Sequence, residues 1–206
     1  LNTVKPSVLV AIDLGRGKAR MAGSILAQVT QQFGNVTPDL DNAEDLKHFA
    51  KLVHKLMLAG CVLSYHDRSD GGLLTTIAEM MFAGHTGVTL TLDSMVESAS
   101  AGDVAKALFN EELGAVLQVP VDRVEEVIAE VKACGLADCT HFIGEINHDD
   151  RLVVNAHDHT VYEASRCELQ KVWTEVSWQI ARRRDNPTCA DQEYGRCTME
   201  DDTGLF

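Results

Sequence analysis

The sequence predicts an α+β fold in which helices cover a mixed β-sheet. Along most of the chain, short apolar runs typical of strands alternate with segments of helical period. Between residues 141 and 164, three strand-like segments follow one another, and the letters NAHDHT indicate a hairpin turn. Alternation alone favours a parallel sheet, whereas a hairpin requires an antiparallel pair. We therefore expect a mixed sheet.

The strands are predicted from apolar runs and from alternation of apolar with polar residues. The clearest alternation is VTLTL, residues 88–92, in which one face should be buried. The run Cys61-Val62-Leu63 opens a strand that we expect to lie inside the sheet. The expected strands cover residues 7–14, 61–67, 86–92, 115–119, 141–146, 151–156 and 160–164.

The helices are predicted from apolar residues that recur every three or four positions. The strongest pattern begins after Asn42, a favourable N-cap, and is closed by Gly60. The expected helices cover residues 21–33, 42–59, 72–82, 101–111, 121–134 and 168–184. Pro187 ends the last of them, and the following residues show no apolar period. We therefore expect one domain over residues 1–187 and a poorly packed linker over residues 188–206.

Charge and cysteine spacing argue against several classes of protein. A formal net charge of −13 repels nucleic-acid backbones, so no nucleic-acid partner is expected. No apolar stretch approaches the length of a membrane span, so no membrane partner is expected. None of the six cysteines forms a C-x-x-C pair, which favours reduced thiols in a cytoplasmic protein. The chain begins with Leu1 rather than methionine, which suggests a piece of a longer protein.

The segment SYHDRSDGGLL, residues 64–74, is the strongest candidate site. It places polar residues where a strand passes into a helix, and a helix N-terminus suits phosphate oxygens. Gly71 and Gly72 would let a ligand approach the backbone, Ser69 would donate to a phosphate, and Asp67 and Asp70 are oxygen donors suited to Mg²⁺. The alternative is ordinary turn chemistry, with Ser69 or Asp70 as the N-cap. The residues alone leave both interpretations open.

Two further segments qualify on the same grounds. FNEELGAVLQV places Glu111 and Glu112 before a glycine and a strand, although a solvated helix end is the simpler interpretation. IDLGRGKARMAGS offers three glycines, two arginines and Lys18 between a strand and a predicted helix. It matches neither the Walker A pattern nor G-x-G-x-x-G, so a surface loop is favoured there.

Taken together, the segments resemble a known family. LVAIDLGRGKARMAGSILAQV, LSYHDRSDGGLLTTIAEMMFAGHTGV, LFNEELGAVLQV and RRRDNPTCADQEY occur in the order and spacing of one enzyme family. They resemble the last AIR synthase-like C-terminal subdomain in the synthetase region of the large single-chain phosphoribosylformylglycinamidine synthases (FGAM synthases). The resemblance implies an AIR synthase C-terminal domain-like fold, and a tail that leads toward a glutaminase domain absent from this chain.

The resemblance also implies an activity. The family uses ATP and glutamine-derived ammonia to convert formylglycinamide ribonucleotide to formylglycinamidine ribonucleotide in purine biosynthesis. By resemblance, Asp67 is a Mg²⁺ ligand, and Ser69, with Gly71 and Gly72, contacts ATP or ADP. The expected partners are the remaining synthetase subdomains and the glutaminase domain of the same polypeptide, so this piece is expected to be inactive alone.

The resemblance leaves two points open. The superfamily commonly has Gly-Arg where this chain has Gly114-Ala115, which removes the basis for a substrate contact at Ala115. No role for His66, Arg68 or Asp70 is implied. The alternative function is a non-catalytic, structural nucleotide-binding domain of the same enzyme.

Overall fold

The computed structural model describes residues 1–197 and 199, and in them seven strands form one mixed sheet. The strand order is β2-β4-β1-β5-β3-β6-β7. All adjacent pairs are antiparallel except β3 with β6, which are parallel, so the predicted α+β fold with a mixed sheet is confirmed. The strands are β1 Ser7–Asp13, β2 Ser64–Asp67, β3 Gly87–Thr91, β4 Gly114–Pro120, β5 Thr140–Asn147, β6 Arg151–Ala156 and β7 His159–Ser165.

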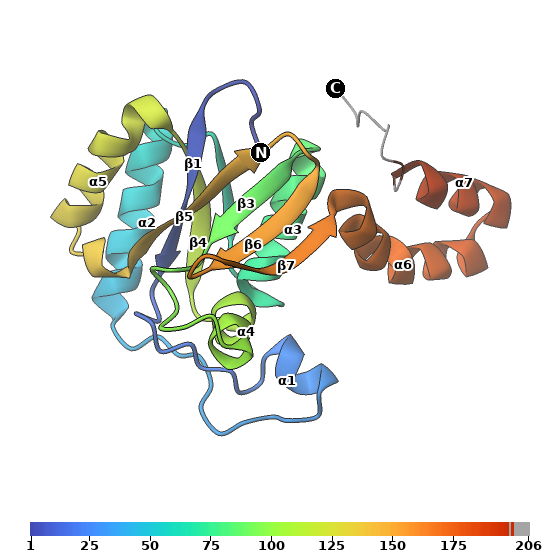
Figure 1. Ribbon diagram of the computed structural model, residues 1–206, viewed down its shortest axis with the longest axis horizontal. Coiled ribbons are helices and arrows are strands. Elements are labelled where there is room, and N and C mark those ends of the chain that lie inside the picture. Colours follow the sequence, from blue (N-terminus) through green and yellow to red (C-terminus); the bar gives the residue numbers. More distant parts are fainter. Residues whose placement is uncertain (198, 200–206) are drawn as a thin grey trace.

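The helices are arranged on both faces of this sheet and at its end (Figure 1). Their bounds are α1 Ile25–Val29, α2 Ala43–Leu58, α3 Gly72–Gly84, α4 Ala101–Phe109, α5 Val124–Ala133, α6 Arg166–Arg184 and α7 Pro187–Cys197, with single 3₁₀ turns at Val121–Arg123 and Ala137–Cys139. Among the described residues, no helix is both long enough and apolar enough to cross a membrane.

Two apolar cores lie on opposite faces of the sheet, because successive side chains of a strand alternate between faces. From β1, Leu9 and Ala11 join the core beneath α3 and α4, whereas Val10 and Ile12 join the core beneath α2 and α5. The middle of this strand, VLVAI, is therefore continuously apolar because both of its faces are covered. This double cover fixes the position of the carboxyl end of β1, where the candidate site lies.

The strand that enters the candidate site lies at the edge of the sheet, not inside it as expected. β2 begins at Ser64, three residues later than predicted, and pairs with β4 alone among the described strands. Cys61 is fully buried and lies before the strand. An apolar run indicates burial, which Cys61 obtains from the helical layer, but it does not indicate how many strands lie beside it.

The helix expected over residues 21–33 is only the five-residue α1. Gly23 has a φ of 78° and Gln31 a φ of 57°, and neither value fits a right-handed helix. Val29 and Phe33, two of the apolar residues that suggested the helix, are 72% and 65% exposed. Their spacing was helical, but no layer of the described chain covers them, and a short helix without packing is marginal.

The segment after Pro187 is also different from the prediction over its first part. Residues 187–197 form helix α7, which packs against α6 in a hairpin that extends away from the sheet (Figure 1). Asn186 Oδ1 accepts from the backbone N–H of Thr188 at 3.0 Å, and Pro187 occupies the first helical position, where its missing N–H costs nothing. The rest of the predicted linker, residue 198 and residues 200–206, lies outside the described residues, and the domain boundary stays a prediction.

Candidate functional site

The three candidate segments meet at one end of the sheet. β1 and β2 each pair antiparallel with β4, so they run in the same direction, and their carboxyl ends lie beside the amino end of β4. The loop after β1, the loop after β2 and the residues that precede β4 therefore come together. Asp13 pairs with Gly114, and Asp67 pairs with Ala115. The topology thus converts three separated polar segments into one polar region.

Glu111 connects two of these segments through backbone hydrogen bonds. Its Oε1 accepts from the N–H of Gly71 at 2.8 Å and from the N–H of Ile25 at 2.9 Å. A single carboxylate oxygen thereby links the start of α3 to the start of α1. The simpler interpretation of Glu111, a solvated helix end, is wrong, because this carboxylate organises the loops around it.

Arg68 is buried and is bound on several sides. Its Nε donates to the Glu112 carbonyl at 2.7 Å, and its Nη2 donates to Asp13 Oδ1 and to the Leu113 carbonyl. The Arg68 and Asp13 side chains are 4% and 6% exposed, so this is a buried ion pair. Asp13 also accepts from the N–H of Gly17 at 2.8 Å, which shapes the loop after β1. Arg68 therefore holds the strand ends together.

Glu112 forms the second buried ion pair of the region. This residue is fully buried, and its Oε1 accepts from Arg20 Nε at 2.7 Å. The hydrogen bond from Arg20 to Glu112 raises the pKa of the Arg20 guanidinium, which also reaches Asp41. We call Asp13, Arg20, Arg68 and Glu112 the buried charge cluster. The expected solvated helix end is wrong for Glu112 as well, because its charge is neutralised inside the protein.

The other side chains of the motif face solvent. Asp67, Ser69 and Asp70, which we call the polar loop, are all exposed. The N-cap of α3 is Gly71, with no side-chain cap hydrogen bond, so neither Ser69 nor Asp70 caps the helix. The capping part of the alternative interpretation is therefore wrong, whereas the turn itself is present, because the N–H of Gly72 donates to the Ser69 carbonyl oxygen. Asp67 Oδ1 accepts from the Tyr65 hydroxyl, and burial together with this hydrogen bond raises the pKa of Tyr65.

The two glycines are required by the turn itself. Gly71 and Gly72 have φ values of 82° and 68°, a conformation that glycine adopts without cost. A Cβ on Gly72 would lie 2.7 Å from the carbonyl oxygens of Asn110 and Leu108. Within the chain, the N–H of Gly71 donates to Glu111 and the N–H of Gly72 donates to the Ser69 carbonyl at 2.9 Å. Contact of these glycines with a nucleotide stays a prediction.

His66 points to the face of the sheet opposite Asp67. Its Nε2 lies 2.9 Å from Glu79 Oε2 on α3, and its Nδ1 lies 2.8 Å from the Asp67 carbonyl oxygen. Glu79 Oε1 in turn accepts from Trp173 Nε1 of α6 at 2.9 Å. Sequence reasoning singled out His66 but missed Glu79, Trp173 and Tyr65. Of these, Tyr65 alone had a sequence signal, because it lies two residues before Asp67 on the same face of β2.

The donor set fits Mg²⁺ only as part of a larger site. Among the described residues, no group of three or more His, Cys, Asp or Glu side chains could hold a metal ion. Mg²⁺ is commonly bound through one or two carboxylates together with substrate phosphates and waters. An exposed Asp67 beside a helix N-terminus can supply one such carboxylate, and the remaining ligands would come from the nucleotide and from outside this chain.

These features define a class of protein: an α+β domain whose antiparallel-rich sheet presents one exposed polar loop at the start of a helix. The sequence model of the family described as "AIR synthase related protein, C-terminal domain" matches residues 8–157, well over half of the chain. The chain belongs to this family. Helices α6 and α7 lie beyond the matched residues.

Solved structures with the same fold have low sequence identity to this chain. Thermotoga maritima PurL complexed with ATP has a TM-score of 0.63 and 15% identity over 82% of this chain and 26% of that chain. Phosphoribosylformylglycinamidine synthase II from Thermotoga maritima has a TM-score of 0.61 and 13% identity over 80% of this chain and 26% of that chain. Escherichia coli HypE, a hydrogenase maturation protein, has a TM-score of 0.55 and 17% identity over 80% and 52%. This chain spans about a quarter of the length of the PurL structures that it matches.

Proposed function

We propose that this chain is a domain of a phosphoribosylformylglycinamidine synthase and that its polar loop contributes contacts to a Mg-nucleotide. The proposed enzyme is an ATP- and glutamine-dependent carbon–nitrogen ligase of purine biosynthesis in the cytoplasm. The observation that carries the proposal is the division of the motif between two environments. Arg68 is bound within the protein, whereas Asp67 and Ser69 are exposed beside the start of α3, whose Gly71 N-cap makes no side-chain cap hydrogen bond.

The proposed roles follow from the chemistry of these side chains. Bound Mg²⁺ would neutralise the negative charge of the nucleotide phosphates. The Asp67 carboxylate would ligate the metal ion, held in place by the Tyr65 hydroxyl. The Ser69 hydroxyl would donate to a phosphate oxygen near the positive end of α3. Ammonia production and formylglycinamide ribonucleotide binding would be supplied by other segments of the polypeptide, so the chain alone is expected to be inactive.

The bound nucleotide could have either a catalytic or a structural role. Structures similar to this chain include PurL complexed with ATP and PurL complexed with ADP. This similarity supports nucleotide binding but does not favour either role. The structural alternative is supported by Glu111, which connects α1 and α3 at the loop, so a nucleotide held there would stabilise that arrangement. We favour the structural role.

The test substitutes Asp67→Asn in the complete polypeptide, which removes one charge and keeps the shape. Mg-ADP affinity measured by calorimetry should fall roughly tenfold to a thousandfold, because a charged metal contact is lost. Ser69→Ala should cost about 1 kcal/mol. Asp158→Asn, an exposed carboxylate on the turn between β6 and β7, is the control and should leave affinity unchanged.

The same Asp67→Asn protein decides between the two roles. A structural site predicts lower thermal stability and less retained nucleotide, with turnover preserved in protein that stays folded. A catalytic site predicts lower turnover at unchanged stability. If Mg-ADP affinity, stability and turnover all equal those of Asp158→Asn, the polar loop binds no Mg-nucleotide and the proposed function is wrong.

A further inference from the structure

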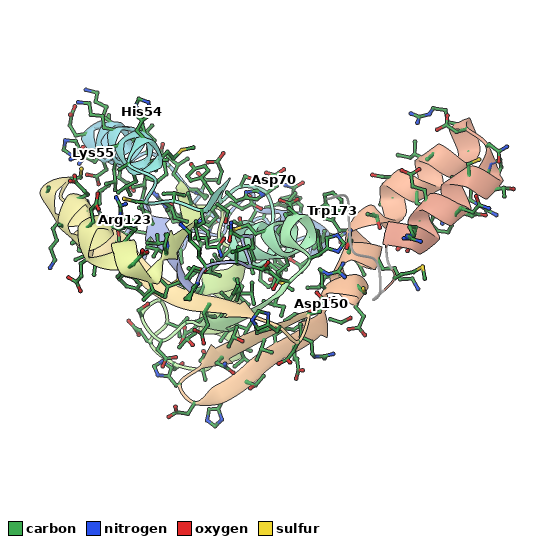
Figure 2. The ribbon with its side chains drawn as sticks, turned by 90° about the horizontal axis from the view of Figure 1, so that it is seen from above. His54, Lys55, Asp70, Arg123, Asp150 and Trp173 are labelled. Carbon is green, nitrogen blue, oxygen red and sulfur yellow. The ribbon has the colours of Figure 1, made fainter. Side chains whose placement is uncertain are left out.

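A chain of hydrogen bonds runs from helix α6 to the backbone of the polar loop. Trp173 Nε1 donates to Glu79 Oε1 at 2.9 Å, His66 Nε2 lies 2.9 Å from Glu79 Oε2, and His66 Nδ1 lies 2.8 Å from the Asp67 carbonyl oxygen. The three side chains come from α6, α3 and β2, and Trp173 of α6 lies 94 residues from Glu79 in sequence. Figure 2 shows Trp173 between α3 and α6.

The chain is defined by which atoms can donate. A carbonyl oxygen and a carboxylate only accept hydrogen bonds, so the indole N–H of Trp173 and the ring of His66 are the donors, and His66 donates at both contacts only when both ring nitrogens carry a proton. Both oxygens of Glu79 are used, one for each neighbour. The Trp173 ring also packs against Phe82, with ring centroids 5.6 Å apart. Glu79 therefore connects Trp173, a 54% exposed side chain on α6, to the strand that ends at Asp67.

The Asp67 backbone is fixed by this connection. Its carbonyl oxygen lies within hydrogen-bonding distance of His66 Nδ1 and also accepts from the Thr76 hydroxyl at 3.2 Å. Both neighbours lie on the α3 face, opposite the Asp67 side chain. The carboxylate of an exposed aspartate is well oriented only when the peptide that carries it is held, because metal ligands need support from the residues behind them.

We propose that Glu79 and Trp173 are positioning residues for the Mg-nucleotide contact of Asp67. The inference rests on the proposed function of the polar loop and adds two residues that touch neither metal nor nucleotide. Trp173 lies outside residues 8–157, the part of the chain that matches the family. The proposed support for the loop therefore comes from a helix outside the residues that match the family.

The first test compares the two tryptophans of α6 in the complete polypeptide. Trp173→Phe keeps a ring against Phe82 and removes the N–H that Glu79 accepts. Trp178→Phe is the matched control. Trp178 Nε1 donates to Asp191 at 2.9 Å and the Trp178 ring stacks on Tyr194, and both of these partners belong to α7 and not to α3. Trp173→Phe should weaken Mg-ADP binding by roughly threefold to tenfold, and Trp178→Phe by less than about twofold.

The second test uses two substitutions of Glu79. Glu79→Ala removes the connection and should weaken Mg-ADP binding at least as much as Trp173→Phe. Glu79→Gln keeps an oxygen for Trp173 and presents an N–H₂ group to His66 Nε2, which accepts in the neutral ring while Nδ1–H still donates. Affinity should therefore be close to that of the unaltered protein. If Glu79→Gln is as damaging as Glu79→Ala, hydrogen bonding is not what Glu79 provides and the inference is wrong.

A readout of the metal separates positioning from general stability. ADP binding is measured with and without Mg²⁺ by calorimetry, and the loss in Trp173→Phe and Glu79→Ala should be confined to the Mg²⁺-dependent part. An equal loss without Mg²⁺ would overturn the inference. If Asp67→Asn weakens Mg-ADP binding but these variants match Trp178→Phe, the inference fails alone. If Asp67→Asn itself has no effect, the proposed function fails.

Discussion

Arg68 of the buried charge cluster stands between Asp67 and Ser69 of the polar loop in sequence, but the cluster and the loop lie in opposite environments. Arg68 is 7% exposed and donates hydrogen bonds to four residues, three through its side chain and one through its backbone N–H. Asp67 and Asp70, in contrast, face solvent. Charge in the cluster is neutralised within the chain. Charge in the loop is left toward solvent, where a cation can reach it. A cluster of polar residues in the sequence therefore locates a site. Whether each charge is paired inside the chain or left exposed then separates structural residues from residues that can bind a ligand.

The largest expected effect comes from breaking the buried pair. Arg68→Met leaves the Asp13 carboxylate buried without its cation, which should lower the free energy of unfolding by about 3–5 kcal/mol. Arg184→Met is the control, because the Arg184 and Asp185 side chains are 72% and 51% exposed and an ion pair in solvent contributes little. Urea denaturation measures both. Equal losses in the two variants would show that burial does not strengthen the Arg68–Asp13 pair, and would contradict its place in the buried charge cluster.

The next effect tests whether the loop is held by close packing. Gly72→Ala and Gly60→Ala both place a side chain at a φ of 68°. At Gly60 nothing lies within 4 Å of the new Cβ, whereas at Gly72 two carbonyl oxygens lie at 2.7 Å. Gly60→Ala should cost about 1 kcal/mol from backbone strain, and Gly72→Ala should cost about 3 kcal/mol or more. Denaturation midpoints that coincide would show that the start of α3 moves freely.

A smaller effect, which depends on pH, is expected at His141, next to Asp13 of the buried charge cluster. His141 lines a cavity of about 130 Å³ beside Asp13, and burial lowers its pKa below the ordinary value of 6.5. Nearby Asp13 opposes this shift, but burial dominates. Below pH 6.5 the unfolded chain therefore binds more protons at this residue than the folded protein does. Stability should be complete at pH 7 and should fall as the pH is lowered toward 5.

The measurement compares two histidine variants over that range. His141→Asn should reduce the loss of unfolding free energy between pH 7 and pH 5. His148→Asn, which alters an exposed histidine on the turn before β6, should leave the loss unchanged. Carboxylates with lowered pKa values, such as Asp41 and Glu168, contribute only at more acidic pH. A pH profile that His141→Asn does not alter would contradict the assignment.

The sequence predicted where the strands and helices lie along the chain better than it predicted which of them pack side by side. Strands such as VTLTL follow from local alternation, and Gly87–Thr91 confirms that strand. The edge position of β2 depends on pairing with β4, about fifty residues later, which no local pattern records. The same holds for Arg68 and Asp13, 55 residues apart in sequence and in contact through the sheet. By contrast, Asn186-Pro187 was a usable signal for the start of α7, since Asn is a good cap and Pro a good first residue.

The candidate site could be found from the sequence because so many polar residues are unusual after a strand. Which of these residues are buried and which are exposed could not be predicted. Arg68, Ser69 and Asp70 are equally polar in sequence, and burial separates them only once β1 and the residues at the start of β4 are in place. Glu79 and Trp173 were missed because each has an ordinary place in a helix. Trp173 was counted on an apolar face of α6, yet Val172 and Val176 on that helix are 72% and 68% exposed. Apolar spacing therefore did not reveal that its indole N–H binds Glu79.

The smallest expected effect lies on the exposed side, at Asp70. Among the described residues, none forms a hydrogen bond or ion pair with its side chain, and the residue precedes the Gly71 cap of α3 without capping the helix itself. Its charge lies near the positive end of α3, an interaction that is weak in solvent. Asp70→Asn should therefore change the free energy of unfolding by less than about 0.5 kcal/mol in urea denaturation, against the several kcal/mol expected for Arg68→Met two residues earlier. A loss above about 1 kcal/mol would show that this carboxylate belongs with the buried charge cluster and would remove it from the surface available to a ligand.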